Sequence, residues 1–403
     1  MAPPRKGSGK FNKRPQGGKS SRKPEGKFRP LAGGVAPKRN EKPSGGAAKH
    51  AHKTSGATPK GPEKTGAAAT KHADKPEAFE KEKIEKPQPV RRALNQGPTP
   101  RSHAPLMLTM PSFDDYELID SGFEQKLERY GPYNVVRPEG QALWQPRLSE
   151  ATWNAADAVF SGNDDEETAG RWRFQNRLAE AKKEHDWTLG HEGLKFQARF
   201  TAFRHMGFFP EQAAHWHWFH DLIKNAGRPI KVLNLFGYTG LASLMAAKAG
   251  ASVTHVDASK KAIGWARENQ SISGLDEAPI RWICDDAVKF VEREARRGNT
   301  YDGIIMDPPK YGRGPKGEVW QFFEGANDLL HASRAILSED PLFFILSSYA
   351  IRASFMASHE LARDAFSGLG GVIESGELLI NETDSERQLS TSLYTRWSKE
   401  GTK

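Results

Sequence analysis

A strand followed by two prolines is the most informative feature of this sequence. The apolar run 303–306 leads into Asp307-Pro308-Pro309-Lys310-Tyr311. Because proline has no N–H to donate to a sheet, the chain must leave the sheet there, which frees carbonyl oxygens beside the Asp307 carboxylate. Such acceptors suit an amino group. We expect Asp307 and the Pro308 carbonyl to hold an amine, and Lys310 or Tyr311 to contact the same ligand.

A glycine-containing loop forms a second candidate site. The apolar segment 232–235, which includes Asn234, runs into Phe236-Gly237-Tyr238-Thr239-Gly240, and a helix is predicted to start at once. Gly237 and Gly240 permit a tight turn and a close ligand approach, while the N–H groups of the helix start favour an anionic group. Open α/β sheets bind ligands at this end of the first strand. The spacing differs from the Gly-x-Gly-x-x-Gly fingerprint of dinucleotide enzymes.

Acidic residues follow the next two predicted strands. Asp257 ends the segment 252–256 and can accept hydrogen bonds from both hydroxyls of a ribose, although it could instead only cap the helix that begins near Ser259. After the third strand, Asp286 is the candidate to receive the exocyclic amine of an adenine, whereas Asp285 is expected to cap a helix. Together with the loop, these carboxylates favour a nucleoside ligand.

Alternating strands and helices position these residues from Lys231 onward, which predicts an α/β fold with a seven-stranded Rossmann-like sheet. The predicted strands are 231–235, 252–256, 280–283, 302–306, 342–347, 372–380 and 389–397. The predicted helices are 240–249, 259–270, 286–297, 318–337 and 353–367. Because no helix separates the last two strands, we expect an antiparallel end to the sheet.

A small α+β domain is predicted over residues 105–206, before the main domain at 207–403. It combines strands near 116–119, 126–130 and 134–136, a helix at 149–160, and a further β-rich pair at 171–174 and 187–203. The segment Gly207-Phe208-Phe209-Pro210-Glu211-Gln212 and an aromatic-rich helix, 213–225, lead into the main domain.

Residues 1–104 differ from the rest in composition. They carry 25 Lys and Arg against 8 Asp and Glu, a net charge of +17, whereas the rest of the chain has a net charge of −8. Few aromatic residues and no apolar periodicity predict a disordered basic tail that could contact RNA phosphates or could simply aid solubility. The single cysteine, Cys284, predicts a reducing, cytoplasmic compartment. We expect no metal site and no membrane span, and the sequence leaves the oligomeric state open.

In these motifs the chain resembles the class I S-adenosylmethionine-dependent methyltransferases, and within them the bacterial rRNA large-subunit methyltransferases with an Asp-Pro-Pro-Lys-aromatic motif. The resemblance covers about residues 112–399. It implies that the segment from Asn234 to Gly240, including Thr239, binds S-adenosylmethionine, with Phe236, Gly237, Tyr238 and Gly240 around its methionine part. It also implies that Asp257 binds the ribose, Asp286 the adenine and Asp307 the acceptor base, and that Gln212 lies near the cofactor pocket.

Two departures from the family narrow the chemistry. Relatives that methylate carbon 5 of cytosine use a cysteine on the fifth strand, where this chain has Ser347-Ser348. We therefore expect direct methylation of a base nitrogen in RNA, most simply ribosomal RNA. Lys310 stands where amine-methylating enzymes place an aromatic residue, which leaves an exocyclic amine and a ring nitrogen such as guanine N7 both open. We also expect no room for the RNA-binding PUA domain that some relatives carry at their N-terminus, because the basic tail occupies its place.

Arg313 and Lys316, in the loop after Tyr311, are candidates for RNA contact. Three other interpretations remain: a methyltransferase with a different substrate, a non-catalytic RNA-binding or ribosome assembly factor that retains the fold, and a nucleotide-dependent oxidoreductase.

Overall fold

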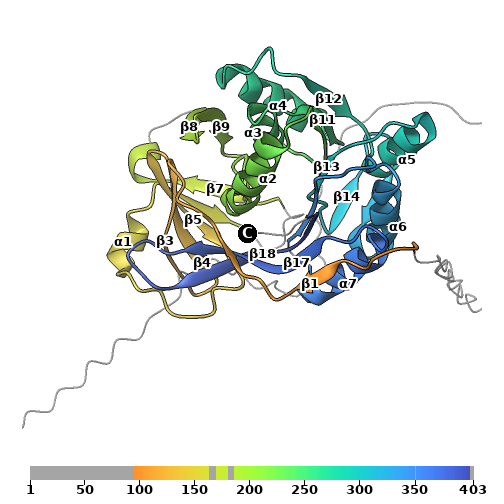
Figure 1. Cartoon of the computed structure of the whole chain (residues 1–403). Helices are drawn as coiled ribbons and strands as arrows, with labels where there is room; N and C mark the ends of the chain where they lie inside the picture. The colour runs from red at the N-terminus through yellow and green to blue at the C-terminus, as the bar shows by residue number, and fades with distance from the viewer. Residues whose placement is uncertain (1–94, 163–168, 180–185, 350, 400–403) are drawn as a thin grey trace, which may run out of the picture. The chain divides into compact units, whose positions relative to one another are not determined.

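The computed structural model describes residues 95–162, 169–179, 186–349 and 351–399. The described residues all belong to the unit Lys86–Lys403 (Figure 1). Most of the predicted basic tail, residues 1–94, lies outside the described residues.

A nine-stranded mixed sheet forms the centre of the C-terminal region. Its order is β1-β17-β18-β16-β13-β10-β11-β12, with β2 also paired to β17. All seven strands predicted from the sequence belong to it: β10 (Lys231–Leu235), β11 (Ser252–Asp257), β12 (Ile280–Cys284), β13 (Gly303–Met306), β16 (Phe343–Ser348), β17 (Val372–Asn381) and β18 (Gln388–Ser398). Strands β10–β13 and β16 pair in parallel, and β18 runs antiparallel to both β16 and β17, as expected.

The predicted count of seven strands is too low, because β1 (Arg101–His103) and β2 (Leu108–Thr109) extend the sheet along β17. Strand β1 also lies inside the range assigned to the tail, so that the ordered body begins earlier than predicted. Short edge strands are held by backbone hydrogen bonds, such as Arg101 N to Gly371 O at 2.9 Å, and these leave little trace in the pattern of side chains.

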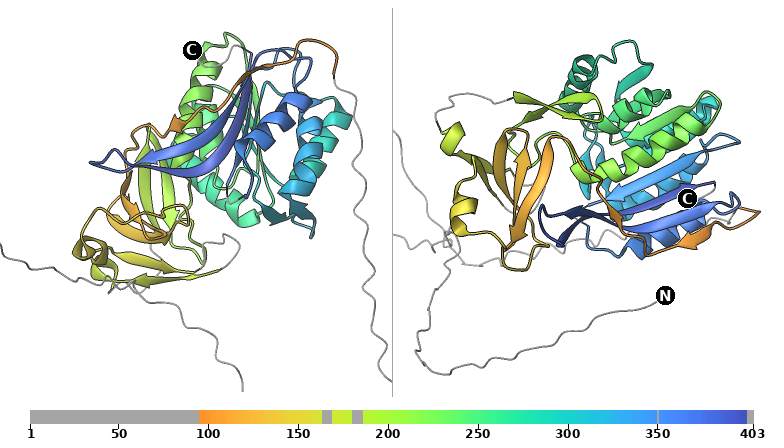
Figure 2. Two further views of the ribbon diagram at one scale, coloured as in Figure 1. Left: turned by 90° about the horizontal axis from the view of Figure 1, so that it is seen from below. Right: turned by 60° about the vertical axis from the view of Figure 1, so that its left-hand side comes forward.

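Helices cover both faces of the sheet because successive residues of the buried strands point to opposite sides. Val232 packs with α2 (Ala213–Asn225) and α3 (Leu241–Lys248), whereas Leu233 packs with α5 (Ala287–Arg297), α6 (Phe322–Arg334) and α7 (Phe355–Ala365) (Figures 1 and 2). Helix α4 (Lys260–Ile272) lies beside α3. In the part of the chain that the structure describes, no helix is long and apolar enough to cross a membrane.

Residues after the double proline form a hairpin rather than the start of a helix. Strand β14 (Tyr311–Arg313) pairs antiparallel with β15 (Val319–Gln321), and α6 starts only at Phe322 instead of at residue 318. The turn is closed by hydrogen bonds between Gly314 and Glu318 and between Gly317 and Gly314, and Gly317 adopts φ +89°. Because residues 319–321 pair with residues 311–313, the chain stays extended up to Gln321 and the helix cannot begin earlier.

The preceding region contains a five-stranded sheet of β3 (Tyr116–Gly122), β4 (Gln125–Tyr130), β5 (Tyr133–Pro138), β6 (Ala158–Ser161) and β7 (Arg171–Phe174), and a hairpin of β8 (Asp186–His191) and β9 (Leu194–Arg199). The helix predicted over 149–160 is α1 (Glu150–Asn154) only. It ends early because Asp157 accepts a hydrogen bond from Asn134 N at 2.9 Å, which directs Ala158 into β6 beside β5.

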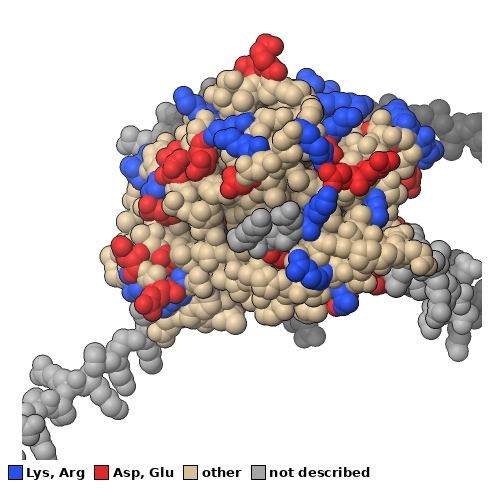
Figure 3. Space-filling view, in the orientation of Figure 1, with Lys and Arg blue, Asp and Glu red and all other residues tan. Residues whose placement is uncertain are grey.

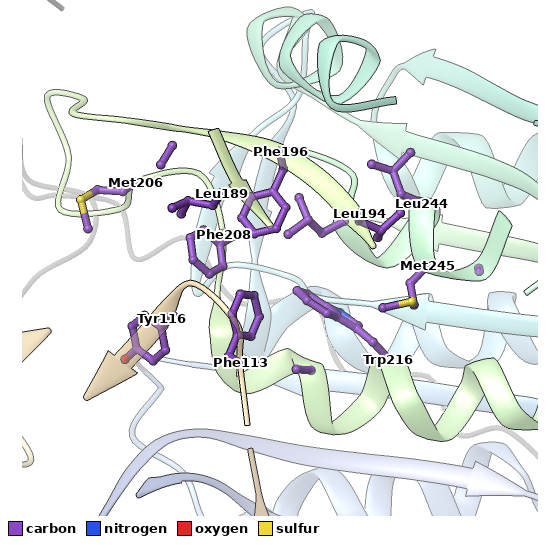
Figure 4. Close-up of a cluster of buried hydrophobic side chains, with 14 of the residues drawn as sticks. Phe113, Tyr116, Leu189, Leu194, Phe196, Met206, Phe208, Trp216, Leu244 and Met245 are labelled. Carbon is purple, nitrogen blue, oxygen red and sulfur yellow. The ribbon is translucent and has the colours of Figure 1, made fainter. Parts of the chain in front are cut away.

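One aromatic cluster joins this region to the main sheet. Phe113 and Tyr116 pack against Phe196 and Phe208, and the cluster continues through Trp216 to Leu244 and Met245 on α3 (Figure 4). Packing of this kind fixes the segment 200–212 against the carboxyl ends of the parallel strands.

Candidate functional site

A cleft of about 900 Å³ opens at the carboxyl ends of β11, β12 and β13. Its lining combines the ends of these strands with the segment 199–209, and a smaller cavity of about 60 Å³ lies beside it under the glycine loop. Phe209, Phe236, Tyr238 and Asp307 line both spaces. A volume of this size is enough for a nucleoside cofactor and part of an acceptor.

The loop after β10 has a strained backbone. Phe236 and Tyr238 adopt φ of +56° and +50°, and Gly240, which starts α3, has φ +87°. A non-glycine residue in this region costs about 1–3 kcal/mol, so that surrounding contacts must hold the loop. Tyr238 N donates to Asp257 Oδ2 at 2.9 Å, and Gly237 N donates to Val256 O at 3.1 Å.

Asp257 both supports this loop and faces the cleft. Its Oδ2 accepts from Tyr238 N, and its Oδ1 accepts from Ser259 N at 2.7 Å. Burial raises the pKa of Asp257 above its ordinary value, and the two N–H donors oppose that shift. Each carboxylate oxygen keeps a second lone pair, so the group can still accept hydrogen bonds from a vicinal diol.

Of the two acidic residues after β12, Asp286 and not Asp285 caps the following helix, α5. Asp286 is the N-cap of α5, with its Oδ1 accepting from Lys289 N at 3.0 Å, although Asp285 was expected to be the cap. Asp285 instead pairs with Arg293 and accepts from Asp286 N. Both residues line the cleft.

Three residues predicted to bind the cofactor have buried partners within the protein. Asn234 Nδ2 donates to Ser243 Oγ at 2.9 Å, and Thr239 Oγ1 donates to Gly207 O. A Cβ on Gly237 would overlap the His255 ring, so that close packing requires this glycine. All three line the small cavity, whereas Gly240 lines neither space.

The segment 307–311, which follows β13 and which we call the lip, divides into residues that line the cleft and residues that do not. Asp307 and Pro309 line the cleft, and Trp320 Nε1 donates to Pro309 O at 2.8 Å, which occupies one of the carbonyls freed by the prolines. The described residues that line the cleft do not include Pro308, Lys310 or Tyr311. Lys310 is exposed and its carbonyl accepts from Phe322 N, while Tyr311 belongs to β14.

The segment before α2 contributes more than the sequence indicated. Gln212 lines the small cavity, where its Oε1 accepts from Ser347 Oγ at 3.0 Å. Phe209, His205 and Tyr349 also line the cleft, and the sequence motifs do not identify them as site residues. The Phe208-Phe209-Pro210 run gave a signal for Phe209, but His205 and Tyr349 lie in segments with no distinctive spacing.

The two cations proposed for RNA contact differ in position. Arg313 lines the cleft, whereas Lys316 lies at the exposed tip of the hairpin and does not line it. Glu318 accepts from Lys289 Nζ at 2.7 Å and from Lys316 N at 2.8 Å, and the Lys289 contact lowers the pKa of Glu318 to about 2. Lys, Arg, Asp and Glu side chains are interspersed on the face shown in Figure 3.

Cys284 lies far from the lip in the sheet order. It ends β12, an edge strand separated from β13 by β11 and β10. Its side chain is exposed and Sγ lies 3.5 Å from Ala258 O. Within the described ranges no group of three or more His, Cys, Asp or Glu residues could hold a metal ion.

The cleft fits an adenosine-type ligand. Carboxylates from the ends of neighbouring strands, Asp257 and Asp286, suit hydroxyl and amine donors. Apolar side chains between them provide surfaces for a purine ring, namely Phe236, Val256, Ala262 and Ala287.

Known proteins resemble both the sequence and this fold. The profile of the S-adenosylmethionine-dependent methyltransferases matches residues 167–367. The crystal structure of a SAM-dependent methyltransferase from Agrobacterium tumefaciens is 54% identical, with a TM-score of 0.72, over 76% of this chain and 98% of that one. SMU.776, solved in complex with SAH, shares the fold at 17% identity and a TM-score of 0.52, over 70% of this chain and 75% of that one.

Curated relatives match over shorter lengths. Ribosomal RNA large subunit methyltransferase I of Shewanella denitrificans is 44% identical over 20% of each chain. Ribosomal RNA large subunit methyltransferase K/L of Shewanella frigidimarina is 27% identical over 51% of this chain and 30% of its own. The match therefore spans less than a third of these relatives. The extent of the Agrobacterium match, the profile and the cleft geometry together show that the chain belongs to the S-adenosylmethionine-dependent methyltransferase family.

Proposed function

We propose that the protein methylates a base nitrogen of RNA, without a cysteine nucleophile. The observation that carries this proposal is the composition of the lip. Asp307 lines the cleft at the end of β13, and Ser347 and Ser348 end the neighbouring strand β16, while the only thiol of the chain is on β12. Because carbon 5 of a pyrimidine needs covalent activation and a nitrogen does not, this lip suits a nitrogen acceptor.

In this proposal the residues of the cleft act by positioning. S-adenosylmethionine, when bound, supplies a methyl group on a sulfonium centre. Asp257 accepts hydrogen bonds from the ribose and Asp286 from the adenine amine, while Phe236 and Tyr238 border the methionine part. Asp307 accepts hydrogen bonds from the acceptor and orients its lone pair, whereas the carbonyl of Pro308, which does not line the cleft, has no part in this proposal.

RNA is the proposed substrate for three reasons. The curated relatives are named as rRNA methyltransferases, residues 1–104 have a net charge of +17, and Arg313 lines the cleft. We further propose that residues 105–206 form a substrate-side domain, since Arg199, Thr201 and His205 contribute to the cleft wall. A target base would have to leave its stack to reach Asp307.

Mass spectrometry of ribosomal RNA from wild-type and deletion cells tests the proposal. We expect one methylated nucleotide to be lost in the deletion strain and restored by the wild-type gene. Asp307→Ala should fail to restore it while still binding S-adenosylmethionine in calorimetry. Full restoration by Asp307→Ala would favour a non-catalytic assembly role, and an unchanged set of modified nucleotides would refute an rRNA substrate.

A further inference from the structure

The lip contributes no aromatic side chain to the described lining of the cleft. Lys310 follows the two prolines and is exposed, and neither Lys310 nor Tyr311 is among the described residues that line the cleft. If the acceptor is a planar base, as the proposed function states, its face needs an apolar partner to replace the stacking lost on leaving the nucleic acid.

Three rings from separate segments meet on the wall of the cleft instead. His205 follows β9, Phe209 precedes the 3-10 helix η2 (Pro210–Gln212), and Tyr349 follows β16. The ring of Phe209 lies 4.8 Å from His205 and 5.4 Å from Tyr349, and His205 lies 6.4 Å from Tyr349. All three residues line the cleft that also contains Asp307. We call these residues the aromatic triad.

Contacts with the five-stranded sheet fix the backbone next to the triad. Arg137 Nη1 donates to Arg204 O at 3.0 Å, and Thr201 Oγ1 donates to His205 O at 3.1 Å. Arg137 itself is buried in an ion pair with Glu128 at 2.7 Å. The backbone that carries His205 is therefore fixed before any ligand arrives, which lowers the entropic cost of binding.

Ring spacing defines how a base could use the triad. A base between two rings needs about 7 Å between them, because each stacked face requires about 3.5 Å. The three centroid distances, 4.8, 5.4 and 6.4 Å, are all shorter. A base therefore cannot insert between these rings and can only stack on a ring face that lines the cleft.

We propose that Phe209 and Tyr349 form the surface on which the acceptor base stacks, in place of an aromatic residue in the lip. This inference rests on the proposed function and adds the side chains that bind the base once it is unpaired or extruded from its helix. Tyr349 is the sharper test, because Phe209 also contacts Tyr238 of the cofactor loop at 5.9 Å whereas Tyr349 lines no part of the small cavity.

Full-length Tyr349→Leu, Tyr349→Phe and Phe323→Leu proteins test this inference. Leucine keeps apolar bulk but removes the π face, and phenylalanine keeps the face. Phe323 is 64% exposed and does not line the cleft, so its variant controls for loss of an aromatic residue in general. The assay measures transfer of labelled methyl groups to ribosomal RNA from deletion cells, and calorimetry measures S-adenosylmethionine binding.

We expect kcat/KM for RNA to fall by about 5- to 150-fold in Tyr349→Leu, the range for one stacked base. Tyr349→Phe and Phe323→Leu should stay near wild type, and cofactor affinity should be unchanged in all three. Wild-type activity of Tyr349→Leu would overturn the stacking role alone. Loss of cofactor binding in that variant would assign Tyr349 to the cofactor site instead. A wild-type protein that methylates only protein substrates would refute both this inference and the proposed function.

Discussion

The carboxylate of Asp257 both stabilises the neighbouring loop and faces the cleft where the ligand would bind. Its two oxygens fix the backbone of Tyr238 and Ser259, and the Tyr238 backbone is left-handed. The residue that would bind the ribose thus also maintains the shape of the neighbouring loop. Its position at the end of a strand could be predicted from sequence, but its contact with Tyr238 N could not, since that contact depends on the fold of the loop.

Asp257→Asn should weaken binding of S-adenosylhomocysteine by about 10- to 150-fold, the effect of losing a hydrogen bond to a charged group. An amide has only one acceptor oxygen, so its NH₂ group would also face a backbone N–H. Isothermal calorimetry measures the change. Asp276→Asn, at an exposed position, is the matched control, and equal affinities for both variants would contradict the assigned role.

At the scale of elements, the strands β4 and β5 bury an ion pair directly behind the aromatic triad. Glu128 is fully buried and accepts from Arg137 Nε at 2.7 Å and from Tyr116 OH at 2.8 Å. Burial alone would raise the pKa of Glu128, but Arg137 and Lys126 outweigh it and lower the pKa to about 2. The folded state therefore favours the charged carboxylate.

Glu128→Gln should lower the free energy of unfolding by about 3–5 kcal/mol, because Arg137 would remain buried without its counter-charge. Glu117→Gln, which breaks the more exposed pair with Arg129 in the same sheet, should cost about 1 kcal/mol or less. Urea unfolding measures both. Similar losses in the two variants would show that burial does not determine the strength of these pairs.

The pH dependence of stability follows from the same pair. Since folding lowers the pKa of Glu128 from 4.5 to about 2, its stabilising contribution is complete above pH 4.5 and is lost as the pH falls toward 2. The Glu128→Gln protein should show a smaller loss of stability across this window than the wild type does.

Prediction from sequence succeeded where an element has its own apolar pattern. The buried strands β10, β13 and β16 are mainly apolar, and the loop 236–240 and Asp307 directly follow β10 and β13. It failed where pairing between distant segments decides, as for β1 and β2, for the early end of α1, and for the hairpin before α6. The aromatic triad belongs to the second kind, because only the tertiary fold brings residues 205, 209 and 349 together.

At the scale of the whole molecule, charge is separated along the chain. Residues 1–104 have a net charge of +17, whereas the rest of the chain has a net charge of −8. A negatively charged body does not by itself attract RNA, and positive side chains are needed to displace counterions from phosphates. We therefore expect the N-terminal segment to supply most of the electrostatic attraction, while the cleft selects the acceptor.

Deletion of residues 1–94 should leave the unfolding midpoint and cofactor affinity unchanged, because β1 and the rest of the described body are retained. RNA affinity should fall, and log K should depend less steeply on log salt, by about 0.7 for each lost contact with a single-stranded phosphate. Filter binding over a salt series measures both quantities. A variant of equal length with the Lys and Arg residues of this segment replaced by Gln separates charge from length. If this variant kept the wild-type salt dependence, the segment would not be the RNA-binding element, and the attraction would have to come from cations of the body such as Arg313.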